Sequence, residues 1–106
     1  RARRGSQMVT KRSRIVTGEL AGATSATQMP SVVATMVQFK AVWSNVGNVY
    51  IGVSGVTTVD GTTDTTTGWE LGAGESTPWL PASNLNVFYR ISNNAGDDLT
   101  YIVLSY

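Results

Sequence analysis

The sequence feature that most constrains the fold is an alternation of apolar and other side chains with a period of two, broken repeatedly by turn residues. The longest such run covers residues 31–43, in which Gln38 and Lys40 mark the wetter face. The opposite face is formed by Val33, Thr35, Val37, Phe39, Ala41 and Trp43. This face is expected to lie in a hydrophobic core, with Trp43 as its last member.

Further strands are expected over residues 49–53, 86–92 and 99–106. The turn-forming sequence SNVGN precedes the first of them, so residues 31–43 and 49–53 are expected to form a hairpin. An Asp-Gly pair at residues 60–61 predicts a tight turn followed by a polar, Thr-rich loop.

Residues 15–28 are rich in small residues and Thr, which favours an extended segment that wraps around the rest of the chain. The whole pattern indicates seven or eight short strands, spaced as in a sandwich or barrel. The expected fold is therefore all-β. It is one antiparallel β-sandwich or small barrel, jelly-roll-like, over residues 24–106, preceded by an extended basic N-terminal arm over residues 1–23. The strand order does not follow from the pattern.

The net charge of +1 conceals a strong asymmetry. Residues 15–106 hold seven acidic and two basic residues, whereas residues 1–14 hold six basic residues and no acidic one. The six are Arg1, Arg3, Arg4, Lys11, Arg12 and Arg14. A basic arm on an acidic body predicts a negatively charged partner, either nucleic acid or an acidic protein surface. The alternative is an untied terminus whose natural start is Met8.

The composition offers little for catalysis. The chain has no His and no Cys, so the commonest general base and every thiolate site are excluded. Asp60 with Asp64, and Asp97 with Asp98, could supply oxygen ligands to calcium, but their spacing is too sparse, and solvated turn carboxylates are expected instead. No enzyme activity, cofactor or metal site is predicted. No apolar run is long enough to cross a bilayer, so no membrane association is expected.

Two of the three tryptophans lie in regions that resemble loops. Trp69 and Trp79 flank the turn sequence GAGESTP, between residues that do not alternate as a strand interior does. Tryptophan is enriched at the centres of protein interfaces, so these two are candidates for contacts with a neighbouring subunit, with an ordinary core position as the alternative.

Three segments resemble small structural proteins of tailed bacteriophages: NVGNVYIGVSGVTT, then GWELGAGES, then SNLNVFYRISNNAGDDLTYIVLSY. The matching positions are Asn45, Gly47, Val49 to Gly52, Ser54, Leu71, Gly74 to Ser76, Asn84, Leu85, Asn86 and Tyr89. The resemblance covers roughly residues 24–106 and is greatest to head decoration, or cement, proteins. The basic arm and the sequence TTDTTT lie outside it.

The resemblance implies a non-enzymatic virion protein on the exterior of an icosahedral capsid, present in the host cytoplasm during assembly. Such a protein bridges subunits of the major capsid protein, commonly as a homotrimer. The alternative is a tail, baseplate or fibre module that recognises a host receptor or glycan. Nucleic-acid binding is a third function, which the acidic body disfavours because it offers no basic face with interleaved aromatic residues.

Overall fold

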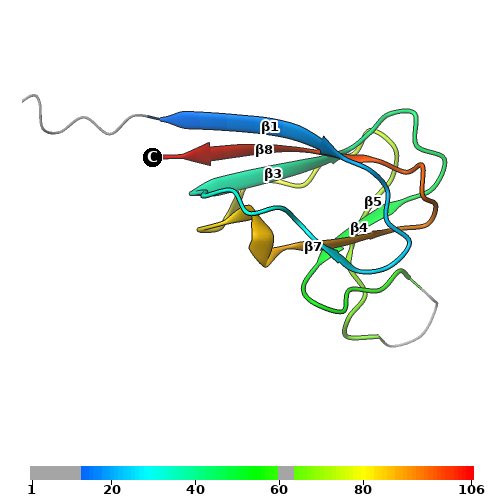
Figure 1. Ribbon diagram of the computed structural model, residues 1–106. Helices are drawn as coiled ribbons and strands as arrows, with labels where there is room; N and C mark the ends of the chain where they lie inside the picture. The colour runs from blue at the N-terminus through cyan, green and yellow to red at the C-terminus, as the bar shows by residue number, and fades with distance from the viewer. Residues whose placement is uncertain (1–12, 60–63) are drawn as a thin grey trace, which may run out of the picture.

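The computed structural model describes residues 13–59 and 64–106 as a sandwich of two four-stranded antiparallel sheets (Figure 1). Strands β1, β8, β3 and β6 form sheet A, and β2, β7, β4 and β5 form sheet B, in those orders. The elements are β1 (Arg14–Leu20), β2 (Thr27–Gln28), β3 (Met36–Ala41), β4 (Val49–Gly52), β5 (Trp69–Leu71), β6 (Leu80–Pro81), a 3-10 turn η1 (Leu85–Val87), β7 (Tyr89–Ser92) and β8 (Leu99–Ser105). The predicted all-β sandwich is confirmed.

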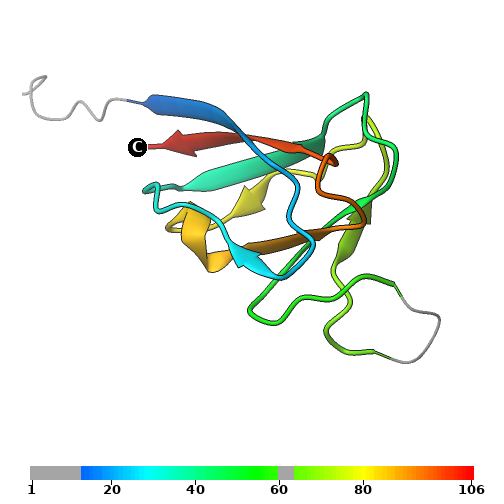
Figure 2. The same ribbon diagram turned by 45° about the vertical axis from the view of Figure 1, so that its right-hand side comes forward.

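The strand order is that of a jelly roll. Strand β1 pairs with β8, β2 with β7, β3 with β6 and β4 with β5, always antiparallel. This nested pairing results when an antiparallel hairpin of four strand pairs is rolled up so that its pairs divide between two sheets. Every connection except that between β4 and β5 therefore crosses from one sheet to the other, and Figure 2 shows these crossings from a second direction.

Two expectations from the sequence differ from this arrangement. Strands β3 and β4 do not form a hairpin, because β3 lies in sheet A and β4 in sheet B. Residues 14–20, expected within the N-terminal arm, form β1, which pairs with β8 along its whole length from Arg14↔Ser105 to Leu20↔Leu99. The sandwich therefore begins at residue 14 and not at residue 24.

Gly18 explains why β1 is hard to recognise in the sequence. It occupies an inward-facing position of the strand, opposite Tyr101 on β8. A Cβ atom at residue 18 would lie only 2.5–2.9 Å from the ring and hydroxyl of this tyrosine, so the aromatic side chain covers the glycine. Because Tyr101 fills the space in which a side chain of residue 18 would lie, the strand has no apolar side chain between Val16 and Leu20, and its alternation is interrupted in the sequence.

The core lies between the two sheets. In β3, Val37, Phe39 and Ala41 are fully buried, as the alternation predicts. The strand begins only at Met36, so the expectation of a strand from residue 31 is wrong, and Val33, expected on the buried face, is 67% exposed. Phe39 packs edge-to-face on Phe88, with ring centroids 5.2 Å apart, and so links sheet A to the segment that leads into β7. The remaining buried side chains of this cluster are Met29, Ala34, Val49, Ile51, Leu71, Leu85, Leu99 and Val103.

Asp97 is a buried carboxylate that joins the β7–β8 loop to the β3–β4 loop. One oxygen accepts hydrogen bonds from the backbone N–H groups of Val46 and Gly47, both at 3.0 Å. The other accepts from the backbone and the side-chain amide of Asn94, at 3.1 and 2.9 Å. Burial alone raises the pKa of Asp97, but these hydrogen bonds outweigh it and hold the pKa below its usual value. The expectation that this residue is a solvated turn carboxylate is wrong.

Asp98 fastens the same end of the sandwich to two further points. Its Oδ1 accepts a hydrogen bond from the N–H of Gly22 in the β1–β2 loop, at 3.0 Å. Its backbone N–H donates to Oδ1 of Asn45, and its carbonyl accepts from Nδ2 of the same residue. Gly47 completes the closure, because a Cβ there would lie 2.7 Å from Oδ2 of Asp97. Three loops are thus held as one unit.

Arg90 is a buried cation on β7. It lies opposite Ile51 and is only 9% exposed. Among the described residues, its hydrogen bonds from Nε and Nη2 both go to the carbonyl oxygen of Ala21, at 3.4 and 3.3 Å. Burial lowers its pKa. A single neutral carbonyl compensates poorly for the desolvation of a guanidinium, so this charge contributes little net stability.

We expect Arg90→Met to leave the free energy of unfolding within about 1 kcal/mol of the original protein, or to raise it, because methionine keeps the packing of the arginine stem and removes the desolvated charge. Arg90→Ala is expected to lower the free energy of unfolding by about 2 kcal/mol or more, because it leaves a cavity. Urea unfolding of the three proteins measures both effects. Equal losses in the two variants would show that the charge itself is needed.

Candidate interaction surface

Trp69 lines an apolar groove at the edge of the sandwich where β5 and β6 end the two sheets. Its side chain lies opposite the inward-facing Ile51, yet it is 65% exposed, because both edge strands are short and leave the sandwich open there. The groove has a volume of about 260 Å³. Its lining is formed by Ile51, Gly52, Val53, Trp69, Thr77, Pro78, Leu80 and Phe88. An exposed indole beside an apolar groove is a suitable anchor for a protein contact.

Trp79 lies at the same edge but on another surface. It precedes Leu80, which pairs with the buried Val37, so the alternation of side chains places Trp79 on the outer face of sheet A. It is 42% exposed. The structure therefore brings both predicted interface residues, Trp69 and Trp79, to the β5–β6 edge, and neither is a core residue.

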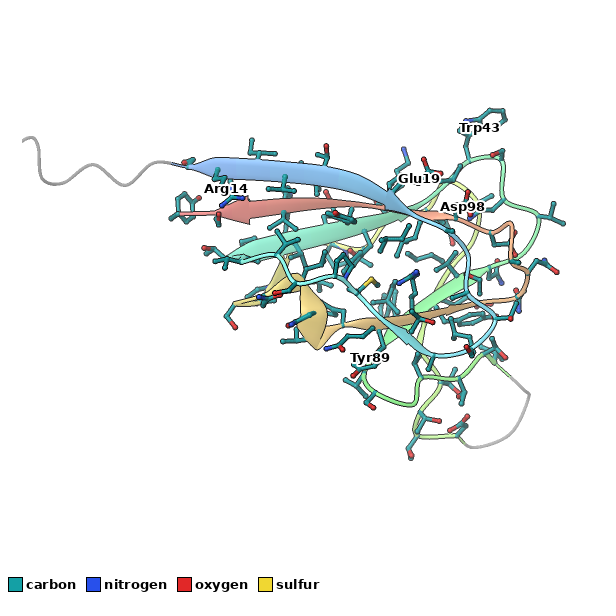
Figure 3. The ribbon with its side chains drawn as sticks, in the orientation of Figure 1. Arg14, Glu19, Trp43, Tyr89 and Asp98 are labelled. Atoms are coloured by element: carbon teal, nitrogen blue, oxygen red, sulfur yellow. The ribbon has the colours of Figure 1, made fainter. Side chains whose placement is uncertain are left out.

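Trp43 is the most exposed of the three tryptophans, at 82%. Strand β3 ends at Ala41, and the chain turns immediately after it, so the tryptophan leaves the buried face. Figure 3 shows Trp43 projecting from the β3–β4 loop away from the sandwich. The prediction that it belongs to the core is wrong. Val46 in the same loop is 94% exposed, so the loop that Asp97 and Asp98 hold presents two apolar side chains to the outside.

Arg14 does not belong to the arm with which the sequence grouped it. It is the first residue of β1, and its side chain is exposed (Figure 3). The other five predicted arm residues lie outside the described part of the chain; they are Arg1, Arg3, Arg4, Lys11 and Arg12.

The carboxylates considered as calcium ligands have other partners. Asp64 accepts hydrogen bonds from the hydroxyls of Thr57 and Thr66 and from the backbone N–H of Thr66. The Thr57 bond contributes most to lowering the pKa of Asp64 to about 2, so the carboxylate closes its own loop. Asp60 lies outside the described residues. Within residues 13–59 and 64–106, no three His, Cys, Asp or Glu side chains form a group that could hold a metal ion.

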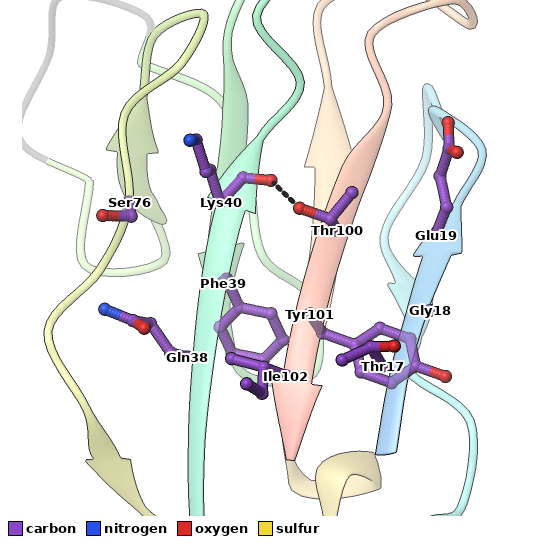
Figure 4. A pocket seen from close by; sticks show the side chains of 10 residues that line it. All are labelled: Thr17, Gly18, Glu19, Gln38, Phe39, Lys40, Ser76, Thr100, Tyr101 and Ile102. Atoms are coloured by element: carbon purple, nitrogen blue, oxygen red, sulfur yellow. Dashed lines mark hydrogen bonds between the residues drawn. The ribbon is translucent and has the colours of Figure 1, made fainter. Parts of the chain in front are cut away.

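The outer face of sheet A also carries a shallow hollow of about 450 Å³ (Figure 4). Glu19 on β1 and Lys40 on β3 lie on either side of Thr100, whose hydroxyl donates a 2.9 Å hydrogen bond to the carbonyl oxygen of Lys40. Gln38 and Thr17 add further polar groups to the lining, which also includes Phe39 and Tyr101. The hollow offers hydrogen bonds and two opposite charges to a ligand, and the hydroxyl of Thr100 donates to a backbone carbonyl and not to Glu19.

Comparisons of the sequence with protein-family models and with curated proteins, and of the structure with solved structures, gave no significant match. In the described part of the chain, no helix has the length and apolar character needed to cross a membrane. The class that can be stated is therefore one of architecture, a jelly-roll β-sandwich with exposed tryptophans at one sheet edge and at one loop.

Proposed function

We propose that this protein is a non-enzymatic virion protein that decorates the exterior of an icosahedral phage head and bridges subunits of the major capsid protein. The observation that carries the proposal is the exposure of Trp43, Trp69 and Trp79: Trp43 on a loop that Asp97 holds by hydrogen bonds, and Trp69 and Trp79 at the β5–β6 edge. Rigidly held aromatic side chains are typical anchors of protein interfaces. The resemblance of residues 24–106 to phage structural proteins supplies the particular class, and jelly rolls are frequent in viral capsid domains.

In this proposal the protein is a homotrimer in which the β5–β6 edges, with Trp69 and Trp79, face one another. Repeating one contact around a threefold axis closes the ring, so the apolar edge of every copy is buried and none stays exposed. A trimer then engages three equivalent capsid sites, so its avidity exceeds the strength of each single contact. The groove beside Trp69 is available in the described structure to receive an apolar group of the neighbour.

The basic residues before β1 are proposed to tether the trimer to carboxylates of the capsid. Deleting residues 1–12 is expected to leave folding unchanged, because β1 starts at Arg14, and to weaken attachment to the particle. Raised salt is expected to weaken attachment of the intact protein in the same direction, because exposed charges are screened within about 10 Å at 0.1 M salt. Co-sedimentation with stripped capsids at two salt concentrations measures both effects. Equal binding of both proteins at both salts would contradict the tether.

A tail, baseplate or fibre module that binds a host receptor or glycan is the second candidate. It is favoured by one observation, the projection of Trp43 from a rigid loop at the end of the sandwich opposite to where β1 begins, since an exposed indole can also stack on a sugar. Copy number separates the two candidates. Electron microscopy of the particle should find hundreds of copies on the head for a decoration protein and only a handful at the tail for a receptor-binding module.

A further inference from the structure

The sandwich has four edge strands, and three of them are blunted. Strands β2 and β6 have two residues each, β6 contains Pro81, and β5 has three residues. Short edges and edge prolines are the usual means by which sheets avoid pairing with other chains. Only β1 differs among the described edges, because it has seven residues and contains no proline. It pairs with β8 on one side and with no described strand on the other.

The charges on β1 are suited to one kind of partner. Arg14 begins the strand and Glu19 lies near its end, and both side chains are exposed (Figure 3). If two copies of the strand run antiparallel, the cationic end of each lies beside the anionic end of the other. A parallel arrangement would place like charges together, which is unfavourable in a strand pair. The antiparallel arrangement is therefore favoured by the charges at the two strand ends, although Arg14 and Glu19 lie on opposite faces of the strand and do not pair directly.

We propose that β1 of one copy pairs antiparallel with β1 of a second copy and joins two A sheets into one continuous sheet. The partner is thus another molecule of this chain, held by main-chain hydrogen bonds across a twofold axis. This edge lies on the opposite side of sheet A from β6, so it is distinct from the edge that carries Trp69 and Trp79. The inference goes beyond the proposed function, which does not depend on it.

The register of the pair follows from symmetry. The outer faces of both copies lie on one side of the joined sheet, so outward-facing residues must oppose outward-facing ones. The register that pairs all seven residues places the twofold axis at Thr17, which lies opposite its own copy. Ile15 then lies opposite Glu19 of the second copy, and each of these residues is far from its own equivalent.

Cysteine crosslinking of the full chain tests this arrangement, and the absence of native cysteines removes any background. Single variants Thr17→Cys and Thr100→Cys are compared during mild oxidation. Thr100 is the matched control, because it faces outward on the same sheet but lies on the interior strand β8. We expect covalent dimer to form about tenfold faster or more with Thr17→Cys, because pairing raises the effective concentration of its thiol. Equal rates in the two variants would overturn the proposal.

A mixture of Ile15→Cys and Glu19→Cys distinguishes the strand directions. Antiparallel pairing predicts that the two variants crosslink to each other and not to themselves, whereas self-crosslinking of each would indicate parallel strands and overturn the proposal. The pairing of Ile15 with Glu19 of the second copy gives an independent readout in the Thr17→Cys protein. Ile15→Lys should speed crosslinking, because the new cation lies opposite Glu19 on the same face, and adding Glu19→Lys should remove the gain. No change of rate with Ile15→Lys would count against a second copy as the partner.

Discussion

Replacing Asp97 by alanine is expected to lower the free energy of unfolding by about 3 to 5 kcal/mol, the largest effect of any single substitution considered for this protein. The side chain is 1% exposed, and its removal leaves the N–H groups of Val46, Gly47 and Asn94 without their acceptor. Each kcal/mol corresponds to a fall of about 4–8 °C in Tm for a domain of this size. Thermal and urea unfolding both measure the change.

Two further variants control this experiment. Asp97→Asn keeps the shape of the side chain and one acceptor oxygen, but its NH₂ group then faces N–H donors. The free energy of unfolding should therefore fall less than in Asp97→Ala, but still measurably. Glu75→Ala removes an exposed carboxylate that accepts one local hydrogen bond from Gly72, and it should change stability by less than about 1 kcal/mol. An Asp97→Ala variant as stable as Glu75→Ala would show that the loops do not depend on the buried carboxylate.

The pH dependence of stability gives a second readout of Asp97. Because its folded-state pKa is lowered, its contribution is present above the unfolded pKa of about 3.9 and is lost as the pH falls through the folded value. The free energy of unfolding should therefore decrease below about pH 4. The decrease should be smaller in Asp97→Asn, though not absent, because Asp64 with its pKa of about 2 acts in the same direction.

Replacing Trp69 by alanine is expected to abolish the proposed trimer. Indole anchors at the centre of an interface contribute about 2 kcal/mol or more each, and a trimer loses this contribution at every subunit contact. Size exclusion with light scattering should show the mass of the assembly falling by a factor of three, whether or not β1 also pairs two copies. Folding should be retained, because the side chain is 65% exposed.

Trp43→Ala is the matched control for assembly. It removes an even more exposed indole, at 82%, from the β3–β4 loop and not from the β5–β6 edge. The trimer should survive this change. If Trp43→Ala dissociates the trimer and Trp69→Ala does not, the subunit contact lies at the loop end of the sandwich, and the proposed edge contact is wrong.

The sequence predicted the parts of the fold that depend on local pattern. Alternation and turn residues identified the strands that contain Phe39, Tyr89 and Val103, and they placed Phe39 on the buried face. For Trp69 and Trp79 the sequence left an interface position and a core position open, and the exposure of both side chains excludes the core. These properties depend on neighbouring residues, which decide whether a side chain alternates with polar ones or follows a turn.

The tertiary structure alone decided which strands are neighbours. Strand β1 is paired with β8 at the far end of the chain. Gly18 lies beneath Tyr101 and has no side chain, so the alternation that would indicate a strand is missing from the sequence. Trp43 continues the alternation of β3 in the sequence, but the chain turns after Ala41 and carries it outward.

Asp97 shows the same limit most clearly. In the sequence it is one of two acidic residues in a turn, and such residues are usually solvated. Its burial depends on the N–H groups of Val46 and Gly47, about fifty residues earlier, which reach it only when the β3–β4 and β7–β8 loops meet at one end of the jelly roll. Local pattern determined which segments are strands. The pairing of distant segments decided which polar groups are buried and which tryptophans face outward, because the hydrogen-bond partners and the covering surfaces come from elsewhere in the chain.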